Sequence, residues 1–191
     1  MQLSKQTSAV LVFVLCASAG AGCGGASGTN VIAGSTYGGS VHLTIDDGAG
    51  SGVEPSHVPA TMIKLLTYDP TSGAVEVFVG GYVDDGNGSS TSQWQITFAV
   101  ASAPAAGNVY SIMSPLYAQL VNMDADISFE DHNGLANWLG DSGTISVTSL
   151  AGAVATFEVS MANMAPRYST ATGPFTFNGE IVVDLSSLTQ P

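Results

Sequence analysis

The feature that most constrains this chain is the near-strict alternation of apolar and polar residues in short runs. Residues 120–131 read LVNMDADISFED. In an extended chain, successive side chains point to opposite faces, whereas a helix repeats every 3.6 residues. The apolar residues of this run therefore share one face, and its acids share the other. The run predicts a β-strand with one packed face and one hydrated face.

Similar runs recur along the chain, and turn residues rather than helical segments separate them. The expected strands cover residues 40–45, 62–68, 74–83, 93–101, 109–113, 120–130, 144–150, 154–161, 175–178 and 180–185. Turn chemistry at 69–73, 85–88 and 151–152 predicts three hairpins. The pattern predicts an all-β fold, either an antiparallel β-sandwich or a partly open barrel of about 8–10 strands.

Three local patterns refine this prediction. In the strand at 93–101, Trp94, Ile96, Phe98 and Val100 share a face, which we expect to line the core. Gly80-Gly81 inside a strand predicts a bulge or a bend. Residues 132–141 read HNGLANWLGD, with Leu135, Trp138 and Leu139 at the i, i+3, i+4 spacing of a helix. We therefore expect at most one short helical turn, near 134–139.

The first 22 residues have the layout of a secretory signal peptide. Lys5 precedes an apolar run at 9–15, and small residues follow. The apolar run is too short to span a bilayer, which takes about 20 apolar residues. We expect residues 1–22 to be a signal peptide, 23–36 a Gly/Ser-rich tether, and 37–191 a single β-domain.

The sequence Gly-Ala-Gly-Cys, which ends at Cys23, resembles the lipobox of bacterial lipoproteins. In that family the cysteine is acylated and becomes the N-terminus, so the resemblance implies lipidation of Cys23. Gly24, which follows this cysteine, resembles the residue at that position in lipoproteins that are sorted to the outer membrane. The family usually has Leu where this chain has Gly20, so ordinary cleavage and free secretion stay open. Cys16, the second cysteine, would leave with the signal peptide, which excludes an intrachain disulfide.

The C-terminal half resembles certain uncharacterised bacterial lipoproteins. The resemblance lies in GNVYSI at 107–112, in the Gly-Thr-Ile-x-Val-Thr strand and its hairpin partner at 141–161, and in GPFTFNGEIVVDL at 173–185. It implies an all-β domain in the cell envelope. It implies no activity, because the shared motifs are features of strands and turns.

The charge balance limits the partners. After residue 22 the chain has 15 acidic residues against only Lys64 and Arg167. Nucleic acid is excluded, because phosphate binding needs clustered basic residues. Anionic lipid headgroups would be repelled, so we expect attachment to a membrane through the lipid anchor alone. The sequence leaves open a protein or glycan partner.

The acids themselves suggest two alternatives. Calcium takes six to eight oxygen ligands, which one straight strand cannot supply. A calcium site would therefore combine the acidic strand with the oxygen-rich turn near residue 85. Its candidate ligands are Asp84, Asp85, Asn87, Asp124, Asp126 and Glu130. Alternatively the acids are simply hydrated, because charges ~6.8 Å apart on a strand repel by only ~0.6 kcal/mol in water.

Catalytic patterns are weak. Two acids at i and i+2 fall within the roughly 6.5–9.5 Å window of inverting glycosidases, but any acidic strand gives this spacing. The sequence contains no Gly-x-Ser-x-Gly, Cys-x-x-Cys or His-Glu-x-x-His motif, and its three histidines lie apart. Trp138 and Tyr117 fall in or near expected loops, where they could stack on sugars. Alternatively, Trp138 caps the core.

From these features we expect a non-enzymatic structural or binding β-domain of an exported, envelope-anchored lipoprotein. The alternatives are a calcium-dependent adhesion or carbohydrate-binding module, and an extracytoplasmic hydrolase.

Overall fold

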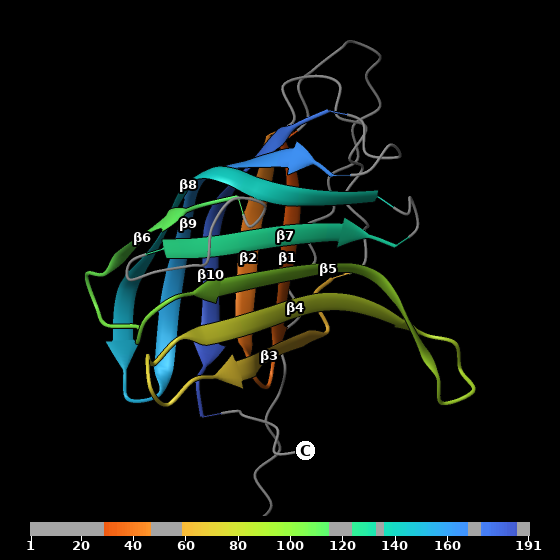
Figure 1. Cartoon of the computed structure of the whole chain (residues 1–191). Helices are drawn as coiled ribbons and strands as arrows, with labels where there is room; N and C mark the ends of the chain where they lie inside the picture. The colour runs from red at the N-terminus through yellow and green to blue at the C-terminus, as the bar shows by residue number, and fades with distance from the viewer. Residues whose placement is uncertain (1–28, 47–58, 115–123, 133–135, 168–172, 187–191) are drawn as a thin grey trace, which may run out of the picture.

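The computed structural model describes residues 29–46, 59–114, 124–132, 136–167 and 173–186, and the regular structure in these residues is entirely β-strand (Figure 1). The strands are β1 (Thr29–Thr36), β2 (Gly39–Asp46), β3 (Met62–Tyr68), β4 (Val75–Asp84), β5 (Ser90–Val100), β6 (Val109–Ile112), β7 (Asp124–Asp131), β8 (Ala136–Ala151), β9 (Val154–Pro166) and β10 (Phe175–Asp184). The predicted all-β class is confirmed. Within these residues, no helix has the length and hydrophobicity to cross a membrane.

The strands form one sheet in the order β1-β2-β10-β9-β8-β6-β7-β5-β4-β3. Neighbouring strands are antiparallel, except β6 and β7, which run parallel. The sheet folds over so that β1, β2, β10 and β9 lie behind β3, β4, β5 and β7 and cross them steeply (Figure 1). At the seam between the two edge strands, the amide of Ala60 donates to the carbonyl of Ala33 at 3.2 Å. The result is a partly open barrel.

One strand joins the two layers. The beginning of β8 pairs with β7 in the front layer, at Ala136–Leu139. Its later part pairs with β6, and β9 follows β8 along most of its length. The register with β9 shifts near Gly140, where the strand bends from one layer into the other.

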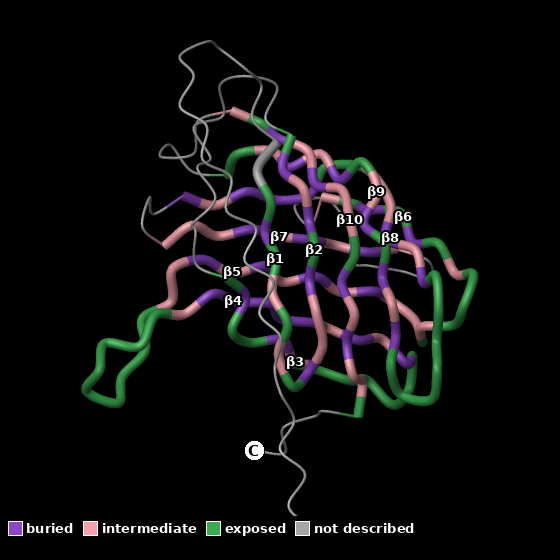
Figure 2. Tube along the Cα trace, turned by 180° about the vertical axis from the view of Figure 1, so that it is seen from behind, coloured by how far each residue is buried: buried purple, intermediate pink, exposed green. Residues whose placement is uncertain are grey.

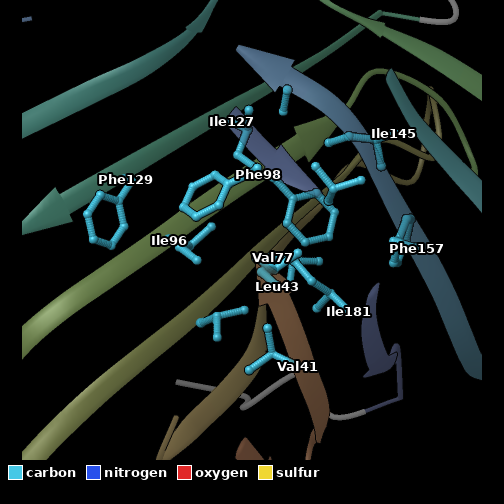
Figure 3. Packing of buried hydrophobic residues seen from close by; sticks show 14 of the residues in the cluster. Val41, Leu43, Val77, Ile96, Phe98, Ile127, Phe129, Ile145, Phe157 and Ile181 are labelled. Atoms are coloured by element: carbon cyan, nitrogen blue, oxygen red, sulfur yellow. The ribbon is translucent and has the colours of Figure 1, made fainter. Parts of the chain in front are cut away.

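The core lies between the layers, where inward side chains of both meet (Figure 3). On β5 the predicted core face, Trp94 to Val100, is at most 1% exposed. Phe98 from this face meets Phe157 of β9 edge-on, with ring centroids 5.1 Å apart. A second aromatic cluster comprises Phe129, Trp138, Phe175 and Phe177. The buried residues form one continuous apolar cluster.

The predicted turns and the bulge are confirmed. Gly86 and Gly88 in the β4–β5 hairpin have φ of 75° and 82°, in the left-handed region that favours glycine. The register of β4 with β5 shifts between Gly81 and Tyr82, as Gly80-Gly81 predicted. A Cβ on Gly80 would lie 2.7 Å from the ring of Phe78. The absence of a side chain at Gly80 therefore lets the ring of Phe78 pack directly on the backbone.

The prediction of a tether over residues 23–36 is wrong for its second part. Residues 29–36 are strand β1, which pairs with β2 without a register shift. Its Ile32 is buried in the core. The Gly, Ser and Ala content of this segment hid the strand, because small residues give little apolar contrast. Residues 23–28 lie outside the described residues.

Where we expected at most one helical turn, the described residues 136–139 form none. Residues 136–139 begin β8, and 133–135 lie outside the described residues. Trp138 and Leu139 are both buried although neighbours on a strand point to opposite faces. A strand covered on both faces thus gives the same spacing of apolar residues as a helix.

The two strands expected at 175–178 and 180–185 are one strand, β10, with a register shift near Asn178. Residues 120–123 of the acidic run lie outside the described part.

Candidate functional site

The polar face of β7 lies on the outside of the sheet, where it meets polar residues of neighbouring strands. Ala99 of β5 lies opposite Glu76 of β4 on one side and Asp126 of β7 on the other. In the next row along the strands, Thr97 lies opposite Ser128. Small side chains thus lie between longer acidic ones, which leaves the surface hollowed.

The hollow has a volume of about 170 Å³. We call it the outer hollow. Its lining residues are Glu76, Thr97, Asp126, Ile127, Ser128, Glu130, Asn137, Leu139 and Arg167. They come from β4, β5, β7 and β8, and from the residue that follows β9. Three carboxylates and one guanidinium group therefore share a small concave surface.

Glu130 is held on several sides within the outer hollow. Its Oε1 accepts a hydrogen bond from Nδ2 of Asn137 at 2.7 Å. Its Oε2 accepts one from Nε2 of Gln95 at 2.6 Å, and Nε2 of His132 lies 3.4 Å away. Both carboxylate oxygens are thereby engaged. Glu130 links the outer faces of β5, β7 and β8.

Asp126 has a different environment. Its Oδ1 accepts a hydrogen bond from the backbone amide of Ala99 at 3.1 Å. Burial raises the pKa of Asp126 above its ordinary value, and the nearby negative charge of Glu76 raises it further. The hydrogen bond from Ala99 lowers this pKa but does not offset the burial. Asp126 is therefore the acid of the outer hollow whose charged form is disfavoured.

Two lining residues, Glu76 and Arg167, were not among the predicted site residues. Oε2 of Glu76 accepts a hydrogen bond from the hydroxyl of Thr67 on β3, at 3.0 Å. Arg167 is placed by its backbone amide, which donates to the carbonyl of Asn137 at 2.8 Å. Both residues join the outer hollow through strand register. No sequence motif predicts the register of these strand pairs.

The predicted calcium ligands are not brought together. Asp84 pairs with Ser90 at the beginning of β5, whereas the carbonyl of Asp124 accepts from the amide of Ala101 just beyond its end. A strand of this length separates the two acids by roughly 37 Å, at ~3.4 Å per residue. The composite calcium site therefore does not form. Across the described ranges, no group of three or more His, Cys, Asp or Glu residues is arranged to hold a metal ion.

The acids near residue 85 shape their own hairpin instead. Oδ1 of Asp84 accepts from the amide of Gly86 at 2.8 Å. Oδ1 of Asp85 accepts from the amides of Asn87 at 2.8 Å and Ser89 at 3.1 Å. Such side-chain bonds to the following backbone are typical of turn-forming Asp residues.

The prediction that Trp138 and Tyr117 could stack on sugars can be compared with the structure only for Trp138. Trp138 is only 2% exposed, and its indole N–H donates to the carbonyl of Gly173 at 3.0 Å. It belongs to the core, so a sugar-stacking role for Trp138 is wrong. Tyr117 and Cys23 lie outside the described residues.

Comparisons with known proteins add no further constraint. No family model matches the chain, and neither the curated proteins nor the solved structures contain a significant match.

The role of Glu130 as a link between strands predicts a stability effect. Glu130→Ala leaves the amides of Gln95 and Asn137 without their acceptor, and we expect a loss of about 1–3 kcal/mol in the free energy of unfolding. Glu130→Gln, which keeps an acceptor oxygen, should lose less. Urea unfolding measures both. Glu158→Ala, on an exposed position of β9, is the control. A loss for Glu130→Ala no larger than that of the control contradicts the proposed link.

The raised pKa of Asp126 predicts a pH dependence of stability. A carboxyl group whose pKa is higher in the folded state stabilises the fold below its unfolded pKa. That contribution is lost as the pH rises through the folded pKa. Asp126→Asn removes this loss. We therefore expect the variant to gain stability relative to the wild type as the pH rises from below the ordinary Asp pKa to neutrality. Urea unfolding over this range tests it, and a pH-independent difference would disprove it.

Proposed function

We propose that this chain is an exported, lipid-anchored domain of the bacterial cell envelope that acts by binding, through the outer hollow, and not by catalysis. The signal-like residues 1–22 and the lipobox-like ending at Cys23 support the location. The observation that carries the binding role is the contrast between the two faces of the sheet. The inner face forms a continuous apolar core, whereas the outer face gathers polar groups from four strands in one concavity.

The dimensions and chemistry of the outer hollow indicate the kind of ligand. Sites that enclose a drug-sized molecule measure about 300–1,000 Å³, so about 170 Å³ suits one small polar group of a larger partner. Most of its charged groups are carboxylates, which only accept hydrogen bonds when ionised. A complementary group would present several donors. The hydroxyl groups of an envelope glycan have this chemistry.

The positions of the acids favour binding over hydrolysis. Asp126 and Glu130 are four residues apart on one strand, which separates their Cα atoms by roughly 13–14 Å. This exceeds the window of about 6.5–9.5 Å for an inverting carboxylate pair. Glu76 is nearer to Asp126, but its carboxylate is bonded to Thr67 on the far side of β4. Each of the three carboxylates accepts its own hydrogen bonds: Glu76 from Thr67, Asp126 from Ala99, and Glu130 from Gln95 and Asn137.

Lipid anchoring can be tested through Cys23. We expect the wild-type protein to fractionate with membranes, with an acylated cysteine as the first residue in intact-mass analysis of its N-terminal peptide. Cys23→Ser should move the protein to the soluble fraction. An unacylated wild-type N-terminus at Gly20 or Gly22 would show that the protein is freely secreted.

Binding can be tested separately with soluble Cys23→Ser protein and isolated envelope polysaccharide in a co-sedimentation assay. A hydrogen bond to a charged group contributes about 1.5–3 kcal/mol, so adding Glu76→Gln and Asp126→Asn should weaken binding by about tenfold or more. Adding Glu158→Gln, on the other layer, should have no effect. Binding that is insensitive to the double substitution, or no binding at all, contradicts the proposed role of the outer hollow.

A further inference from the structure

The hairpin that joins β4 to β5 is exposed from Val83 to Thr91. It projects from the barrel as a loop of exposed residues (Figure 2). Its tip contains Asn87 followed by Gly88. An Asn-Gly pair carries its own chemistry, because its backbone and side chain can react with each other.

In this reaction the backbone nitrogen of the glycine attacks Cγ of the asparagine side chain. The N–Cγ bond forms and the Cγ–Nδ2 bond breaks. The amide proton and the Nδ2 group leave together as ammonia, and a five-membered succinimide remains. Water then opens either carbonyl of the ring. The product is aspartate, or isoaspartate, in which the main chain runs through the former side chain. No oxidant, reductant or enzyme takes part.

The structure of the hairpin leaves both reacting groups accessible. The turn uses the amides of Gly86, Asn87 and Ser89 as donors to Asp84 and Asp85. In the described residues, neither the amide of the glycine after Asn87 nor the Asn87 side chain takes part in a hydrogen bond. A Cβ placed on that glycine would have no heavy atom within 4 Å. The closing ring would therefore meet no neighbouring residue at this glycine.

A second Asn-Gly pair, Asn178-Gly179, serves as an internal comparison. It lies within β10, which is bonded to β2 on one side and to β9 on the other. Oδ1 of Asn178 accepts from the amide of Met161 at 2.7 Å, and its carbonyl accepts from the hydroxyl of Thr44 at 3.0 Å. The backbone of His42 lies against Gly179. Ring closure here would break the bond to Met161 and distort two strand pairings.

We propose that Asn87 is a site of spontaneous conversion to aspartate and isoaspartate in the folded protein, while Asn178 is protected by its strand pairings. Each conversion adds a negative charge beside Asp84 and Asp85. Isoaspartate also adds a backbone methylene to a turn whose shape depends on two glycines with positive φ. The hairpin therefore changes in charge and shape as the protein ages, while the barrel keeps its structure.

The test follows the two pairs in one sample. Folded full-length protein is incubated in mildly alkaline buffer, and its chymotryptic peptides are sequenced by mass spectrometry. Peptides that contain isoaspartate are identified because they elute separately from the corresponding asparagine and aspartate peptides. The pair Asn133-Gly134, outside the described residues, is resolved as its own peptide. Reaction at Asn178 requires its two strand pairings to open first, and the small population of the open form slows the reaction in proportion. We therefore expect conversion at Asn87 to be at least about tenfold faster than at Asn178.

Two controls separate structural protection from local sequence. In denaturant the rates at Asn87 and Asn178 should converge, because both pairs are then unprotected. Asn87→Gln should abolish conversion in the hairpin, because glutamine would have to form a larger ring. Equal rates in the folded protein overturn the proposal. So does an unchanged Asn87 in folded protein under conditions in which the denatured chain reacts.

Discussion

The packing of the inward side chains of one layer against those of the other is the interaction on which the rest of the structure depends. Phe98 and Phe157 meet across the interior, and the cluster around Phe129 and Trp138 fills one side of it. No intrachain disulfide is expected, so burial of apolar surface must supply the stability. Because the inner faces hold the fold together, the outer faces are free to carry acids. The outer hollow is a product of that division, since its polar residues alternate with core residues on the same strands.

Much of the fold could be predicted, because alternation is a property of the residues themselves. The inner face of β5, the bulge at Gly80-Gly81 and the hairpin at 85–88 follow from local chemistry and are confirmed. The errors arose where local contrast was low or misleading. Strand β1 consists largely of small and uncharged residues, and β8 is buried on both faces around Trp138. In both places the neighbouring strands, and not the local sequence, decide the structure.

The candidate site could be predicted only in part, for a related reason. Asp126 and Glu130 stand out because they alternate with core residues on one strand. Glu76 joins them only because Ala99 lies between it and Asp126 in the registers of two strand pairs. Register depends on long-range pairing, which no short motif encodes. The same limitation explains the failed calcium site, since the hairpin near Asp84 and the acid at Asp124 flank opposite ends of β5. The distance between two candidate groups is set by the order of strands in the sheet.

The position of β8 has a consequence for how the molecule can be divided. This strand of 16 residues is bonded to partners in both layers, so a cut within it leaves neither fragment with all of the partners of β8. A protease nick within β8 would loosen both layers together. The two layers should accordingly be degraded together and not one after the other.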